Sequence, residues 1–193
     1  VFGLIASLQD ELGFADGVLG LIAASAFFSA VVAQILLAPL ADRGHTKILM
    51  AGAIVIAALG SLWFAVASSA WELILARVLT GLGIGAFAPA ARAVVANADT
   101  SRAGERLGRL TAVETSGFVA GPVVGAFINE IWGLKAPFLT FACALILILP
   151  SLLKLNFSPP PIAENKISRT ESVLLIVRRK EALGAILLGA ALF

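Results

Sequence analysis

The chain has 193 residues, of which 60% are hydrophobic and only 13% are charged, and its mean hydropathy is +1.00. This small number of polar residues could not cover the surface of a soluble domain. The composition therefore excludes a soluble domain and indicates a membrane protein with several spans. The net charge of +2 and the pI near 9.0 require no nucleic-acid partner, because basic cytoplasmic loops explain them.

Charge-poor segments approach the roughly 20 apolar residues that a helix needs to cross a bilayer. We expect five complete spans, at residues 17–40, 48–68, 71–95, 110–131 and 136–153. Residues 1–8 look like the end of an earlier helix, and residues 182–193 are too short to cross. Because the sequence starts at Val1 and stops within an apolar run, we interpret it as part of a larger transmembrane protein.

The chain changes character after the last complete span. Residues 155–181 begin with a polar, proline-rich stretch that predicts a cytoplasmic linker. Within it, residues 172–180 are compatible with a short helix on the membrane surface or with a plain approach to the next span. The expected organisation is therefore a helix bundle at 1–154, a linker at 155–181 and the start of another span at 182–193.

Basic residues are unevenly distributed between the two sides that these spans define. Most of the 14 lysines and arginines fall on one side, at Arg43, Lys47, Arg102, Arg106, Arg109, Lys154, Lys166, Arg169, Arg178, Arg179 and Lys180. Since loops rich in Lys and Arg stay in the cytoplasm, we assign residues 41–47, 97–109 and 155–181 to that side.

Three charged residues lie more than two residues inside the ends of the apolar spans. Arg77 lies roughly 9 Å inside a helix that begins near Trp71, so we expect it to face the bundle interior, with outward snorkelling or pairing with Glu72 as alternatives. Glu114 lies roughly 6 Å from the cytoplasmic start of its span and is a candidate for binding and releasing protons. Arg92 lies at a similar depth in the preceding span, and we favour an ion pair between it and Glu114.

Glycines recur at four-residue spacing in two spans. They are Gly81 and Gly85 in the third complete span, and Gly117, Gly121 and Gly125 in the fourth. Such stripes predict smooth helix faces that neighbouring helices can approach closely. Pro122 removes a backbone donor within the second stripe and predicts a kink there.

Few residues suit a polar or reactive site. The polar candidates to line a cavity are Gln34, Arg77, Thr80, Thr115 and Ser116, and the apolar candidates are Phe27, Phe28 and Phe87. Cys143 is the only cysteine and His45 the only histidine, so we expect no metal site, no cofactor and no enzymatic activity. The glycines of residues 81–85 lie in mid-span rather than after a strand, which argues against a dinucleotide fingerprint.

Three segments resemble signature motifs of the major facilitator superfamily, and they follow the family's order. Residues 77–85 resemble its R-V-x-x-G-x-G-x-G motif, and residues 117–126 resemble G-x-x-x-G-P-x-x-G-[GA], associated with drug and proton exchangers. Residues 38–47 are similar to its G-x-L-A-D-R-x-G-R-K loop. In that loop Leu40, Ala41, Asp42, Arg43 and Lys47 agree, whereas Ala38 and His45 replace glycines and Thr46 replaces an arginine.

This resemblance implies an all-α fold, the N-terminal six-helix half of a 12-helix transporter with its first helix truncated. It implies export of small lipophilic molecules across a bacterial plasma membrane in exchange for protons, by alternating access and together with a C-terminal bundle absent from this sequence. Asp42, Arg43 and Lys47 would form a cytoplasmic gating loop, with the Asp42 carboxylate meeting a helix N-terminus of the other half. Arg77 would take part in proton coupling.

Alternatives remain for each of these assignments. The loop around Asp42 is also compatible with an ordinary charged connection, and the stripe at residues 117–125 with a generic packing face. The same fold would also suit an exporter of sugars or other metabolites, or a receptor or scaffold that transports nothing. A metabolite exporter would need more polar cavity residues than these spans offer.

Overall fold

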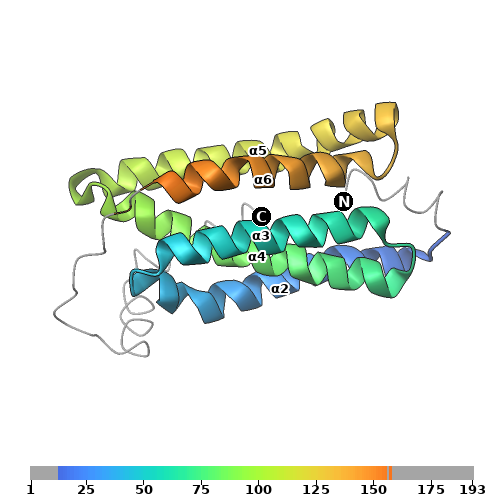
Figure 1. The fold of residues 1–193 in the computed structure, drawn as a ribbon, viewed down its shortest axis with the longest axis horizontal. Helices are drawn as coiled ribbons and strands as arrows, with labels where there is room; N and C mark the ends of the chain where they lie inside the picture. Colours follow the sequence, from blue (N-terminus) through green and yellow to red (C-terminus); the bar gives the residue numbers. More distant parts are fainter. Residues whose placement is uncertain (1–12, 156, 158–193) are drawn as a thin grey trace, which may run out of the picture. The chain divides into compact units, whose positions relative to one another are not determined.

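The computed structural model describes residues 13–155 and 157, and the described part is all-helical (Figure 1). Its helices are α2 (Asp16–Asp42), α3 (Thr46–Val66), α4 (Ala70–Asn97), α5 (Ala103–Trp132) and α6 (Ala136–Lys154), with a short 3-10 turn, η2 (Thr100–Arg102), before α5. Each of the five α-helices is long and apolar enough to cross a membrane. They lie where the apolar runs predicted five spans. The predicted end of an earlier helix, most of the linker and residues 182–193 lie outside the described residues.

α5 begins at Ala103, earlier than the span expected at 110. Its first turns carry charged residues, which are unfavourable inside a bilayer but are compatible with a helix. Arg109 donates a hydrogen bond to Glu105 Oε1 at 2.6 Å, the i,i+4 arrangement that supports an exposed helix. The helix therefore starts before its apolar stretch.

Local signals fix the start of α4. The Ser69 hydroxyl accepts a hydrogen bond from the Glu72 backbone N–H, and the Glu72 carboxylate accepts from the N–H groups of Ser68 and Ser69 at 3.1 Å. This reciprocal capping box satisfies N–H groups that have no partner within the helix. The cap therefore fixes where α4 begins.

α4 lies between α2 and α3, which contact each other little. Glycines permit this arrangement: an added Cβ at Gly83 would come within 2.7 Å of Ala57 of α3, and one at Gly81 would collide with Ala26 and Ser29 of α2. Without a hydrophobic drive between helices in lipid, such close backbone packing is a main source of association. These three helices therefore form an interlocked unit.

α6 packs chiefly on α3, and α5 contacts α4 and α6 more sparsely. One apolar cluster joins α3, α4 and α6 to the beginning of α2, and consists of Leu19, Ile22, Phe64, Ala65, Leu73, Ala76, Leu134 and Phe138. No residue of α5 is buried among the described residues. Few contacts therefore hold α5 against the other helices.

Candidate functional site

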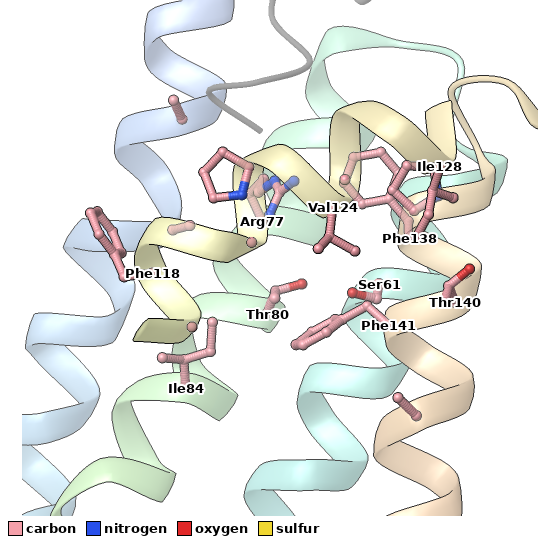
Figure 2. Close-up of a pocket in the computed structure, with 18 of the residues that line it drawn as sticks. Ser61, Arg77, Thr80, Ile84, Phe118, Val124, Ile128, Phe138, Thr140 and Phe141 are labelled. Carbon is pink, nitrogen blue, oxygen red and sulfur yellow. The ribbon is translucent and has the colours of Figure 1, made fainter. Parts of the chain in front are cut away.

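A cavity of about 560 Å³ lies between α5 and the other helices. Figure 2 shows Arg77 and Thr80 of α4 and Phe138 and Phe141 of α6 around this space. Its remaining lining residues are Ala23, Ala26, Phe27 and Ala30 of α2, Ser61 of α3, Ile84 of α4, Gly117, Phe118, Gly121, Pro122, Val124, Gly125 and Ile128 of α5, and Pro137, Thr140 and Ala144 of α6. The lining is predominantly apolar, and Arg77 is its one charged member among the described residues.

Arg77 is placed in the interior, as its depth in the span predicted. Its side chain is partly buried, and its Nε and Nη2 atoms are buried with no hydrogen-bond partner among the described residues. Its guanidinium carbon lies 4.3 Å from the centre of the Phe64 ring and 5.2 Å from that of Phe138. Glu72, the alternative partner, uses its carboxylate at the helix cap instead. Arg77 therefore presents a positive charge within an apolar wall.

Hydroxyl groups supply the other polarity of the cavity. The Thr80 hydroxyl donates to the Ala76 carbonyl at 2.9 Å, and the Thr140 hydroxyl donates to the Ala136 carbonyl at 2.8 Å. Each hydroxyl therefore donates its proton within its own helix, and its oxygen can still accept a hydrogen bond from a bound molecule. Such a surface suits a mostly apolar molecule with a small number of polar groups.

The other charged span residues lie elsewhere. Arg92 Nη2 and Glu114 Oε2 form an ion pair at 3.1 Å that joins α4 to α5, and both side chains are substantially exposed. Within the described structure, neither residue lines the cavity, and neither does Gln34, a partly buried residue of α2. The geometry brings Arg77 to the cavity and leaves Gln34, Arg92 and Glu114 outside it.

The loop after α2 is a tight turn despite its departures from the family pattern. Gly44 adopts a left-handed conformation with φ 86°, and its N–H donates to the Ala41 carbonyl at 3.1 Å. The His45 N–H donates to the Leu40 carbonyl at 3.2 Å. Gly44 therefore closes the helix as glycine commonly does, although His45 stands where the family has a glycine. Arg43 is exposed and Lys47 partly buried; the side chain of Asp42 lies outside the described residues.

The two glycine stripes are placed differently. Gly81 and Gly85 meet α2, where an added Cβ at Gly85 would collide with Ala30. By contrast, nothing described lies within 4 Å of a Cβ added at Gly117, Gly121 or Gly125. These three glycines line the cavity, so the close helix contact expected of them is not found among the described residues. α5 continues through Pro122 without interruption.

Sequence reasoning missed the aromatic residues beside Arg77. Phe64 and Phe138 come from spans other than that of Arg77 and are only 4% and 7% exposed. In the sequence they are ordinary members of apolar runs. Only the packing of α3 and α6 against α4 brings the two rings to the Arg77 guanidinium. A single arginine in an apolar span is the sequence signal that could have prompted a search for such partners.

Five apolar helices, with a cavity lined by a partly buried arginine, define a polytopic helical membrane protein. The family model of the Major Facilitator Superfamily matches residues 1–193, and the chain belongs to this family. This confirms the family and the all-helical fold expected from the motifs.

Several curated relatives of this chain carry the printed name Multidrug resistance protein MdtG. The relative from Klebsiella pneumoniae is 30% identical over 156 residues, which are 80% of this chain and 38% of that protein. Those from Enterobacter lignolyticus and Citrobacter koseri are 29% identical over 157 residues and 31% identical over 140 residues, covering 80% and 72% of this chain and 37% and 34% of those proteins. The chain thus spans little more than a third of the length of these relatives.

Proposed function

We propose that this chain is the N-terminal bundle of a secondary transporter of the bacterial plasma membrane that exports small lipophilic molecules in exchange for protons. The main support is the cavity of about 560 Å³, whose size is that of typical small-molecule sites and whose lining is apolar. The printed name of the relatives, which concerns multidrug resistance, agrees with lipophilic cargo. The partners of the chain are then the substrate, protons, lipid and a second bundle.

Within this proposal, Arg77 is the residue that couples cargo to protons. A cation inside a membrane is costly, so its retention at a cavity wall points to a role in an ion or substrate pathway. Its two buried nitrogen atoms without an acceptor among the described residues support the same assignment. Asp42, Arg43 and Lys47 are assigned to the cytoplasmic gate by their motif.

Glu114 has a different role in our proposal. Its carboxylate pairs with Arg92 at 3.1 Å outside the cavity, so we assign it to holding α4 and α5 together rather than to carrying protons. α5 supplies the movable side of the pathway, because it has no buried residue and its glycines face the cavity.

The experiment uses the complete transporter that contains this chain, reconstituted in liposomes. An imposed proton gradient should drive a fluorescent lipophilic dye across the membrane, and Arg77→Ala should abolish this movement. Arg92→Ala is the matched control, since it removes an arginine from the same helix but not from the cavity. It should retain most of the transport.

The outcomes separate the candidate functions. Transport by Arg77→Ala at the normal rate would exclude Arg77 from coupling. If the folded protein moves no dye from a panel of cationic, neutral and acidic compounds but moves sugars or other metabolites, the substrate class is wrong. Failure to move any solute would favour a receptor or scaffold.

A further inference from the structure

The guanidinium of Arg77 is stabilised in an unusual way. Burying a charge is costly unless it is paired and hydrogen-bonded. Yet Nε and Nη2 of Arg77 are buried and no described residue accepts a hydrogen bond from them. No Asp or Glu is among the described residues that line the cavity. Something other than a carboxylate must offset the cost within the described part of the chain.

Two aromatic rings, and no carboxylate among the described residues, lie beside the Arg77 guanidinium. The guanidinium carbon lies 4.3 Å from the ring centre of Phe64 and 5.2 Å from that of Phe138. Both distances are within the roughly 6 Å over which a ring face attracts a cation, and the attraction is larger at desolvated sites. The ring centres are 4.3 Å apart with planes tilted by 45°, so the rings also pack on each other.

We propose that Phe64 and Phe138 are positioning residues that hold the Arg77 guanidinium at the cavity wall through cation–π contacts. The functional part of this inference rests on the proposed role of Arg77 in coupling. Phe64 belongs to α3 and Phe138 to α6, so the pair fixes a side chain of α4 from two other helices. We call the two rings the aromatic clamp.

The clamp has a consequence that a carboxylate would not have. An ion pair cancels most of the charge of the arginine, whereas a neutral ring attracts the cation and leaves its net charge unchanged. Arg77 thereby stays positive toward the cavity while its position is fixed. A residue that acts on charge in the transport pathway needs both properties.

The rings also belong to the apolar core, so simple truncation cannot test the clamp. Phe64 and Phe138 are buried in one cluster with Leu73 and Ala76, and removing either ring would leave a void that destabilises the bundle. The test must weaken the negative ring face while keeping the ring's shape. Fluorination does this, because each fluorine withdraws electron density from the ring at little change in volume.

The experiment replaces Phe138 in the complete transporter with mono-, di- and trifluorinated phenylalanine by site-specific incorporation. The rate of proton-driven dye movement should fall stepwise with each fluorine, to about threefold to tenfold below the wild-type rate for the trifluorinated ring, from the magnitude of a desolvated cation–π contact. The series at Phe64 should behave alike. Phe87 of α4 is the control, because it packs against a different apolar cluster and neither lines the cavity nor stacks on Arg77 in the described structure, and its series should be flat.

A second measurement separates the clamp from the role of Arg77. The unfolding temperature of the purified protein should fall stepwise with fluorination of Phe138 when Arg77 is present and stay constant in an Arg77→Ala background. If Arg77→Ala transports normally while this difference persists, the clamp stands and the coupling role fails. If the Phe138 series is flat in both transport and unfolding temperature while Arg77→Ala is inactive, the rings only fill space and the clamp is wrong.

Discussion

α4 and α5 carry glycines at the same four-residue spacing and use them in opposite ways. In α4, Gly81 and Gly85 allow α2 to approach so closely that a Cβ at either position would collide with it. In α5, a Cβ added at Gly117 or Gly121 would have nothing described within 4 Å, and both glycines line a cavity. The spacing therefore predicts a smooth helix face, and the surrounding chain decides whether that face packs or stays open.

The same contrast divides the bundle into two mechanical regions. α2, α3 and α4 interlock through backbone approaches that leave no room for a methyl group. α5 has no buried residue, and a sparse set of contacts joins it to α4 and α6. Interlocked elements resist displacement, whereas a loosely held helix can shift at low cost. Substitutions in the two stripes should therefore have opposite consequences for stability and transport.

The largest effect is expected from a large side chain in the packed stripe. Gly85→Leu should lower the free energy of unfolding by about 3 kcal/mol or more, because α2 must separate from α4 to accommodate it. Thermal unfolding of the purified complete protein checks this. Gly121→Leu is the matched variant and should leave the unfolding temperature nearly unchanged. Equal destabilisation by both variants would show that the α5 stripe is packed in the same way as the α4 stripe.

The open stripe should instead be sensitive in transport. Gly121→Leu places a side chain in the cavity and should reduce proton-driven dye movement about tenfold, by excluding cargo, while the protein remains folded. Gly108→Leu controls for glycine replacement in α5, since Gly108 is equally open but does not line the cavity in the described structure. Normal transport by Gly121→Leu would exclude this part of the cavity from the pathway.

The sequence predicted the five spans because each is a long apolar run, and it predicted an interior position for Arg77 because a lipid-facing charge is costly. The sequence could not predict which side chains and helices surround Arg77 and the glycine stripes. The rings of Phe64 and Phe138 reach Arg77 only through the packing of three helices, and the open face at Gly121 depends on which helix lies opposite. Local spacing carries none of this tertiary information.

Boundaries and turns show the same limit. Hydropathy placed the start of the fourth complete span at 110, but Glu105 and Arg109 support the helix outside the apolar region, so α5 starts at Ala103. The loop motif of the family has a glycine at the position that His45 occupies in this chain. Gly44 supplies the left-handed conformation one residue earlier, and the turn forms all the same.

A smaller effect is expected at the ion pair that joins the two regions. Arg92 and Glu114 are 50% and 37% exposed, and exposed pairs typically contribute about 0.2–1 kcal/mol. A double-mutant cycle with Arg92→Gln and Glu114→Gln should give a coupling free energy in this range. A coupling of several kcal/mol would show that the pair, rather than glycine packing, governs how firmly α5 is held.

The smallest effect is expected in the connection between α4 and α5. The Ser101 hydroxyl donates to Asp99 Oδ1 at 2.6 Å, and this hydrogen bond holds the pKa of the Asp99 carboxyl below its ordinary value of 3.8. Because the folded-state pKa is the lower one, the stabilisation is present above about pH 4 and is lost as the pH falls through the folded-state value.

Ser101→Ala should therefore lower the unfolding temperature slightly at pH 7, and the difference from the wild type should shrink as the pH falls through the folded-state pKa of Asp99. Asp99→Asn should behave like Ser101→Ala at pH 7, and adding Ser101→Ala to Asp99→Asn should give a difference that does not change as the pH is lowered. A difference that stayed constant as the pH was lowered would mean that Ser101 stabilises the connection through its backbone turn rather than through the charge of Asp99. A large difference in unfolding temperature between Ser101→Ala and the wild type at pH 7 would mean that this connection holds α5 in place. The sparse packing of α5 against α4 and α6 would then not determine how easily it shifts.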